Sequence, residues 1–161
     1  MFDDHDVEIW PREREPSRDA RVIVAIHGAR DAVSRRLAIS SREHGLDPIE
    51  SLVLGALLRE TACPPWLLRQ RLGLHRSTLS SILDRLERDG RVQRRKNSFD
   101  GRRFEILLTR AGAISADIAE LIIRDVEAEI AGYTSPAQRH GAVAVFEACV
   151  AIGQRDRGSF D

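Results

Sequence analysis

An amphipathic segment bounded by two glycines constrains the fold of this 161-residue chain more than any other feature. Between His75 and Asp89, apolar residues recur at spacings of three and four, which places them on one face of a helix. These residues are Leu79, Ile82, Leu83 and Leu86. The opposite face carries hydroxyl and charged side chains. Gly73 before the segment is typical of a tight turn, and Gly90 after it of a helix end. The pattern predicts a helix that buries one side and offers a polar, partly basic side to a partner.

The flanking segments indicate what surrounds this helix. Pro65 can begin a short helix, with Leu68 and Leu72 facing inward, which ends at the Gly73 turn. After Gly90, two runs at residues 92–96 and 103–108 read as strands joined by an Asn-, Asp- and Gly-containing connection. Two short helices joined by a glycine turn form a helix-turn-helix, and a hairpin directly after the second helix makes it a winged one.

Longer helices are predicted on both sides of this unit. Residues 19–44 carry one apolar stripe, formed by Val22, Ile26, Ala29, Val33 and Leu37. Asp47 and Pro48 are a helix cap and a first helical residue, so residues 47–58 should form a short apolar helix in the core. Thr109 caps a long helix, and a capping box opens the last helix at Ser135. The predicted fold class is mostly α with a small antiparallel β-hairpin: a winged helix-turn-helix with N- and C-terminal dimerisation helices.

Charge is unevenly distributed along the chain, although its formal net charge is zero. Residues 69–110 hold twelve Lys and Arg against five Asp and Glu, a balance of +7, and the remainder has a balance of −7. A basic block inside an otherwise acidic chain is typical of a subdomain that meets phosphate. A charged face that is merely solvated is the alternative.

Several classes of function find no support in the sequence. No apolar run is long enough to span a membrane and no secretory signal is evident, so a cytoplasmic protein is expected. The two cysteines lie far apart without metal-ligand spacing, and they are expected to be reduced and mostly buried. The five histidines share no spacing with each other or with carboxylates that suggests catalysis, and no glycine-rich phosphate loop is present. We therefore expect no enzyme activity, no metal and no cofactor.

The ordered set of motifs resembles the MarR family of winged-helix transcriptional regulators, over residues 46–121. The motifs that carry the resemblance are Leu72-Gly73-Leu74, Arg76-Ser77-Thr78-Leu79, residues 83–90 (LDRLERDG), Asp100-Gly101-Arg102-Arg103, Leu108-Thr109 and Ala111-Gly112. Two positions depart from the family pattern. His75 stands where a better capping residue is usual, and Arg69 stands where the family often has a small residue.

Specific residues can be assigned to the two parts of a DNA-reading surface. The recognition helix would place small hydroxyl side chains, flanked by arginine, against base edges in the major groove. These candidates are Arg76, Ser77, Thr78, Ser80 and Ser81. Further along the helix, Arg85 and Arg88 either reach phosphate or pair locally with Asp84 or Glu87.

In the hairpin, Arg102 would enter the minor groove while Asp100 holds its guanidinium by a charge-assisted bond. Both roles agree with what the resemblance implies. The alternative is that Asp100 and Gly101 simply form the turn and Arg102 is a solvated charge. Arg94, Arg95, Lys96 and Arg103 are expected to contact the DNA backbone.

The outer helices carry more apolar surface than a small winged domain can cover, and the resemblance implies a homodimer on a near-palindromic duplex. We expect a flexible arm at residues 1–18, a dimerisation helix at 19–45, the DNA-binding domain at 46–110 and further dimerisation helices at 111–161. The resemblance also implies a small aromatic or phenolic effector, for which His27, Arg30 and Trp66 are candidate contacts, although ordinary core or surface roles are the alternative for each.

Two rival functions of the same fold remain open. One is thiol-oxidation sensing, because Cys63 lies next to two prolines where it could be accessible; no Lys or Arg adjoins it in the sequence to activate the thiolate. The other is a winged-helix module that binds protein instead of DNA. The operator sequence and the choice between repression and activation are not encoded in these patterns.

Overall fold

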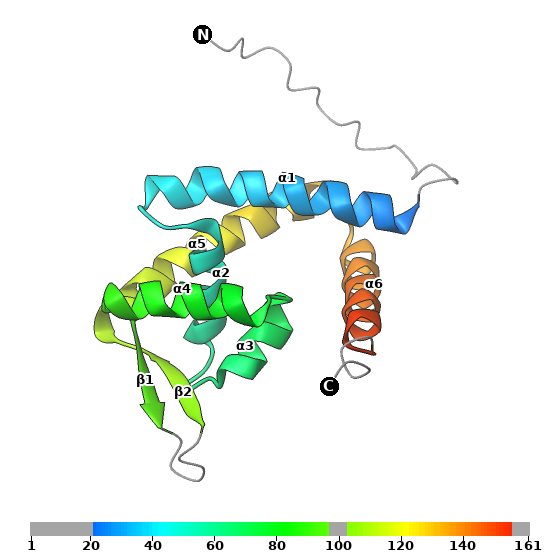
Figure 1. Cartoon of the computed structure of the whole chain (residues 1–161). Coiled ribbons are helices and arrows are strands. Elements are labelled where there is room, and N and C mark those ends of the chain that lie inside the picture. The colour runs from blue at the N-terminus through cyan, green and yellow to red at the C-terminus, as the bar shows by residue number, and fades with distance from the viewer. Residues whose placement is uncertain (1–20, 97–102, 156–161) are drawn as a thin grey trace.

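The computed structural model describes the backbone of residues 21–96 and 103–155 and the side chains of residues 21–96 and 103–153. Six helices and one hairpin follow each other along this part of the chain (Figure 1). They are α1 (Val22–Glu43), α2 (Pro48–Leu58), α3 (Pro65–Leu72), α4 (Arg76–Arg88), β1 (Val92–Lys96), β2 (Phe104–Leu108), α5 (Arg110–Tyr133) and α6 (Pro136–Arg155). The mostly α prediction with one small hairpin is confirmed. The predicted N-terminal arm lies outside the described residues.

Local signals at the helix ends explain where most elements begin and stop. The Asp47 carboxylate accepts the backbone N–H of Ile49 at 2.9 Å, and Pro48 follows as the first residue of α2. At α6, Ser135 and Gln138 satisfy each other's backbone N–H groups, which confirms the predicted capping box. Gly73 and Gly90 have φ of +62° and +69°, a region that a residue with a Cβ adopts only with strain. These signals set the ends of α3 and α4.

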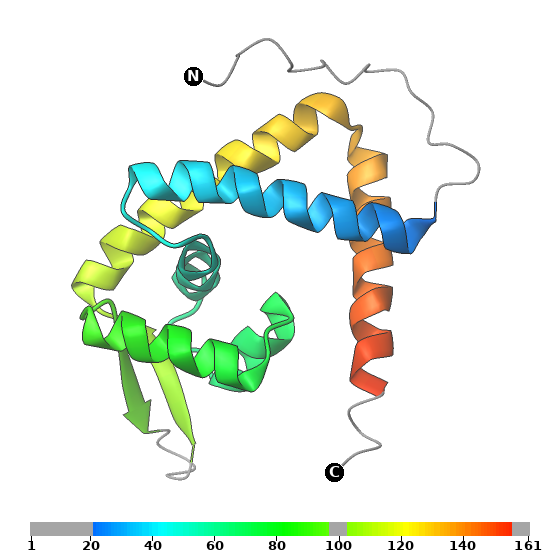
Figure 2. The ribbon, with the colours of Figure 1, turned by 45° about the horizontal axis from the view of Figure 1, so that its top comes forward.

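The core is centred on α2, which Figure 2 shows nearly end-on between α1 and α4 and which packs mainly against α5. Val53, Leu54 and Leu57 on α2 are buried, as the sequence predicts for this helix. From α4, the four predicted apolar residues are all buried. Burying a side chain of this size stabilises the fold by roughly 1.5–3 kcal/mol. Because burial of these apolar side chains stabilises the fold, the opposite, polar face of α4 points outward.

The hairpin is anchored at its base and by a short third segment. β1 and β2 pair antiparallel, with Val92 opposite Leu108 and Lys96 opposite Phe104, so β2 begins one residue later than the sequence predicts. Cys63 adds an isolated bridge to Ile106, with backbone N···O distances of 3.0 and 2.8 Å. This bridge ties the chain just before α3 to the hairpin.

At the base of the hairpin, the start of α5 is locked onto the end of α4. The Thr109 hydroxyl donates to the carbonyl oxygen of Gly90 at 2.6 Å and accepts the N–H of Gly112 at 3.0 Å. A Cβ on Gly112 would lie 1.7 Å from the carbonyl oxygen of Arg91. Only glycine allows this approach, which accounts for the Ala111-Gly112 step in the sequence.

The outer helices leave apolar side chains uncovered. α6 stands beside the winged domain and makes few contacts with it, whereas α1 lies across α2 and α5 (Figures 1 and 2). Of the stripe predicted for residues 19–44, Leu37 is buried, but Val22 is 53% exposed because none of the described residues covers this end of α1. On α6, Val143, Phe146, Val150 and Ile152 are all exposed. No helix in the described ranges is long and apolar enough to cross a membrane.

Candidate nucleic-acid interface

The outward face of α4 carries the side chains that the sequence assigns to base recognition. Arg76, Ser77, Thr78, Ser80 and Ser81 are all exposed. Ser81 donates to the carbonyl oxygen of Ser77, within its own helix. His75 precedes the helix without a side-chain capping bond, as its departure from the pattern suggests. The helix therefore presents small hydroxyl groups along an accessible face that begins with an arginine.

Arg85, at one edge of this face, is held by acidic groups of α2. Its Nε donates to Glu50, and its Nη2 lies 3.8 Å from Asp47. The Glu50 side chain is only 6% exposed, and Arg91 lies 3.8 Å from its other oxygen. The predicted alternative, that Arg85 pairs with Asp84 or Glu87, is therefore wrong, because its partners are Glu50 and Asp47. Glu50 was missed in the sequence, although a lone carboxylate in an apolar helix is a signal that could have revealed it.

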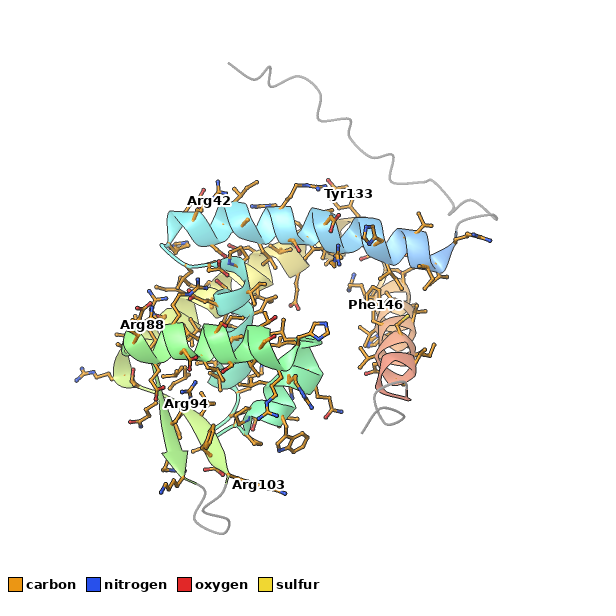
Figure 3. All side chains as sticks on the ribbon, viewed as in Figure 1. Arg42, Arg88, Arg94, Arg103, Tyr133 and Phe146 are labelled. Atoms are coloured by element: carbon orange, nitrogen blue, oxygen red, sulfur yellow. The ribbon has the colours of Figure 1, made fainter. Side chains whose placement is uncertain are left out.

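Asp84 and Glu87 instead pair with the hairpin. Arg94 on β1 contacts Asp84, and its Nη1 lies 3.0 Å from Glu87. Figure 3 shows Arg94 below α4, beside the middle of β1. These pairs fix the hairpin relative to α4 and neutralise two carboxylates that would otherwise repel a phosphate. Arg88 makes no ion pair within the part of the chain that the structure describes, and it points away from the domain at the end of α4 (Figure 3).

The described part of the hairpin is also basic. Arg95 lies 3.3 Å from Glu105 across the strands, Lys96 is exposed, and Arg103 extends outward from the far end of β2 (Figure 3). Asp100 and Arg102, the predicted tip residues, lie outside the described residues. The recognition helix and the basic hairpin thus lie next to each other, with Arg94 between them.

A hollow of about 420 Å³ adjoins α4 on the side of α3 and the hairpin. It is lined by Pro64, Pro65, Trp66, Arg69, Arg76, Leu79, Ser80, Leu83, Arg94, Arg103 and Phe104. Four of these residues are arginines and none is acidic. The sequence marks Arg69 only as a departure from the family pattern. In the structure, Arg69 lines the same hollow as Arg76.

The three candidate effector contacts are not brought together in the described chain. Trp66 lines this hollow and a second one of about 500 Å³, which Cys149 and Val150 of α6 also line. His27 and Arg30 lie exposed on α1, where Arg30 pairs with Asp31 at 3.0 Å, and neither residue lines either hollow.

Cys63 is fully buried, so the expectation that it could be accessible is wrong. Its backbone pairs with Ile106, which turns the side chain into the core. Burial raises the pKa of the Cys63 thiol above its ordinary value, with Glu60 adding to the effect. A neutral, buried thiol is a poor nucleophile. Cys149 is half-buried, and both cysteines are free.

Within the described ranges, no group of three His, Cys, Asp or Glu side chains could hold a metal ion. The chemistry of the surface is therefore that of hydroxyl groups, guanidinium groups and exposed aromatic rings. Such a set binds and positions anions, and hydroxyl groups can also meet base edges.

Comparison with known proteins agrees with this geometry. Residues 44–103 match the sequence model described as the MarR family. Comparison with curated proteins gives no match.

Solved structures share the fold. The S. aureus MepR–DNA complex has a TM-score of 0.69 at 16% identity, over 83% of this chain and 98% of that chain. PcaV from Streptomyces coelicolor, with its natural ligand, has a TM-score of 0.69 at 19% identity, over 86% and 98%. NadR in complex with 4-hydroxyphenylacetate has a TM-score of 0.71 at 19% identity, over 86% and 98%. The matches span nearly the whole length of these proteins.

Proposed function

Because residues 44–103 carry the winged-helix segment of the MarR family, we propose that this protein is a sequence-specific, double-stranded DNA-binding transcriptional regulator, expected to act as a repressor. The observation that carries the proposal is the exposed polar face of α4, with its hydroxyl groups and Arg76, beside a basic hairpin. An α-helix fits the major groove, and arginines on the adjoining strands can meet phosphates. MepR, a protein of the same fold, has been solved in complex with DNA.

A mobility-shift assay on the duplex upstream of the protein's own gene tests this proposal. Wild-type protein should shift the duplex with an affinity that falls as salt rises. Arg76→Ala should weaken specific binding by about tenfold or more, since a good arginine–base contact is worth roughly 1–3 kcal/mol. Arg59→Ala is the control, because Arg59 lies at the end of α2 and pairs with Glu120. Equal affinity of both variants would argue against α4 as the reading helix, and no shift by the wild type would favour a protein-interaction module.

The proposed regulator is a homodimer that reads a near-palindromic site. The support is the apolar surface of α1 and α6 that the chain leaves exposed. One winged domain contacts one half-site, and two copies related by two-fold symmetry double the contacts. The assignment of residues 19–45 and 111–161 to dimerisation rests on the same surface.

We also propose that a small aromatic or phenolic molecule releases the protein from DNA. A protein of the same fold supports this chemistry: NadR was solved with 4-hydroxyphenylacetate, a phenolic acid. PcaV, which also shares the fold, was solved with its natural ligand. His27, Arg30 and Trp66 are the proposed contacts. A concentration-dependent rise in melting temperature with 4-hydroxyphenylacetate, lost in His27→Ala and Trp66→Ala, is the expected result. The buried Cys63 thiol does not support the oxidation-sensing alternative.

A further inference from the structure

The hollow between α3, α4 and the hairpin carries a concentration of positive charge that the recognition helix alone does not explain. Arg69, Arg76, Arg94 and Arg103 line it, and among the described residues no carboxylate does. Arg94 is already paired with acidic groups of α4. Arg69 and Arg76 make no ion pair or side-chain hydrogen bond among the residues that the structure describes. Two like charges that border one space, without a counter-charge, favour an anion between them.

The position of the hollow identifies the anion. Arg76 and Ser80 belong both to its lining and to the exposed face of α4, so the hollow opens along the edge of the proposed interface. In a helix-turn-helix, the first helix crosses the DNA backbone while the second enters the groove. α3 is that first helix here, and Arg69 is its contribution to the hollow.

We propose that this hollow seats one backbone phosphate of the bound duplex, with Arg69 as its ligand; Arg76 borders the same hollow and stays the proposed base contact. Trp66, whose ring is 54% exposed at the rim, packs against the adjoining sugar. The assignment rests on the proposed DNA-binding function and deepens it. It makes Arg69 a residue that supplies affinity without reading sequence, in contrast to the hydroxyl groups of α4.

The lining also holds apolar side chains, so a small aromatic acid is the competing occupant. Phe104, Leu79 and the two prolines could accommodate a benzoate-sized ring, with its carboxylate on an arginine. The backbone phosphate is favoured because the hollow is continuous with the face that is proposed to meet DNA: Arg76 and Ser80 belong to both.

Salt dependence of DNA binding tests the assignment with a matched pair of variants on one helix. Arg69→Gln removes the proposed ligand. Arg71→Gln removes an α3 arginine that does not line the hollow and is paired with Glu60 at 2.7 Å. Affinities of wild type and both variants are measured from 50 to 300 mM salt, on the operator duplex and on an unrelated duplex. Circular dichroism melting confirms that each variant is folded.

Arg69→Gln should lower the magnitude of the slope of log K against log salt by about 0.9, and weaken binding roughly fivefold at 0.15 M salt, equally on both duplexes. Arg71→Gln should leave the slope unchanged. An unchanged slope in Arg69→Gln, with wild type still binding, overturns the phosphate seat while the proposed function stands. Benzoate that binds the free wild-type protein through Arg69, together with an unchanged slope, would assign the hollow to a small acid instead. Failure of the wild type to bind any duplex would instead overturn the proposed function, and the phosphate seat with it.

Discussion

Gly112 is the residue at which the fold tolerates least change. The Cβ of Gly112→Ala would lie 1.7 Å from the backbone oxygen of Arg91, and backbone cannot move aside as a flexible side chain can. We expect Gly112→Ala to lower the free energy of unfolding by about 1–3 kcal/mol or more, the range for overpacking in a well-packed site. Urea unfolding at neutral pH measures the change.

Gly132 provides the control within the same helix. A Cβ there would meet nothing within 4 Å, and alanine is a better helix former than glycine by about 1 kcal/mol. Gly132→Ala should therefore be neutral or slightly stabilising. A similar loss of unfolding free energy in both variants would contradict the predicted clash at Gly112.

Individual residues also show the limits of the sequence. Asp47 and Ser135 could be assigned as caps, because a cap and its partners lie within three residues of one another. The ion pair of Arg85 with Glu50 joins residues 35 positions apart, and only the packing of α2 against α4 brings them together. Cys63 seemed accessible beside its prolines, but its pairing with Ile106 across the fold buries it. Local chemistry was predictable, whereas contacts created by the fold were not.

Among the elements, α1 and α5 are joined by an ion pair that should respond to pH. Arg36 on α1 donates to Glu129 on α5, with Nε 2.9 Å from Oε2. The hydrogen bond from Arg36 lowers the pKa of Glu129 below its ordinary value. Its contribution to stability is therefore present above the unfolded-state pKa of about 4.3 and is lost as pH falls through the lower, folded-state value.

Glu129→Gln should for this reason be less stable than wild type at pH 7, with the difference shrinking as pH falls below about 4. Urea midpoints measured across the acidic pH range and at pH 7 follow it. Both side chains are well exposed, so the effect should be small and should shrink in 1 M salt. Glu127→Gln serves as control, since Glu127 makes no ion pair in the described chain. A wild-type advantage that did not change with pH would exclude the charge pair as its cause.

The elements themselves were largely predictable. The positions of α2, α4 and β1 followed from proline, glycine and apolar spacing, each a signal contained within its own segment. The stripe on α1 was assigned correctly at Leu37 but not at Val22, because periodicity reveals which residues share a face and not what covers that face. The hollow beside α4 needed three elements and could not have been predicted.

For the whole molecule, the exposed surface of α6 predicts a dimer that one pair of charges should disrupt. Phe146 and Val150 are about 45% and 44% exposed and lie one turn apart. Wild type should be a dimer by light scattering at micromolar concentration. Phe146→Glu combined with Val150→Glu should be a folded monomer, because the two carboxylates would have to be desolvated in the interface.

The monomer should also lose most of its preference for a full palindromic site over a single half-site, since only linked copies contact both halves at once. Ile49→Glu, which adds a carboxylate at a partly exposed position on α2, should remain dimeric. A wild-type monomer, or a dimer that survives both charges on α6, would remove α6 from the interface.

The close approach of Gly112 to the Arg91 backbone holds the first turn of α5 in place. The 24 residues of α5 extend for about 36 Å. Its N-cap residue, Thr109, is hydrogen-bonded to Gly90, which lies between α4 and the hairpin. If α5 tilts by about 5° around its first turn, its length alone gives a displacement of about 3 Å at Tyr133. A large displacement at Tyr133 therefore corresponds to only a small change at the first turn of α5, where α4 and the hairpin meet it.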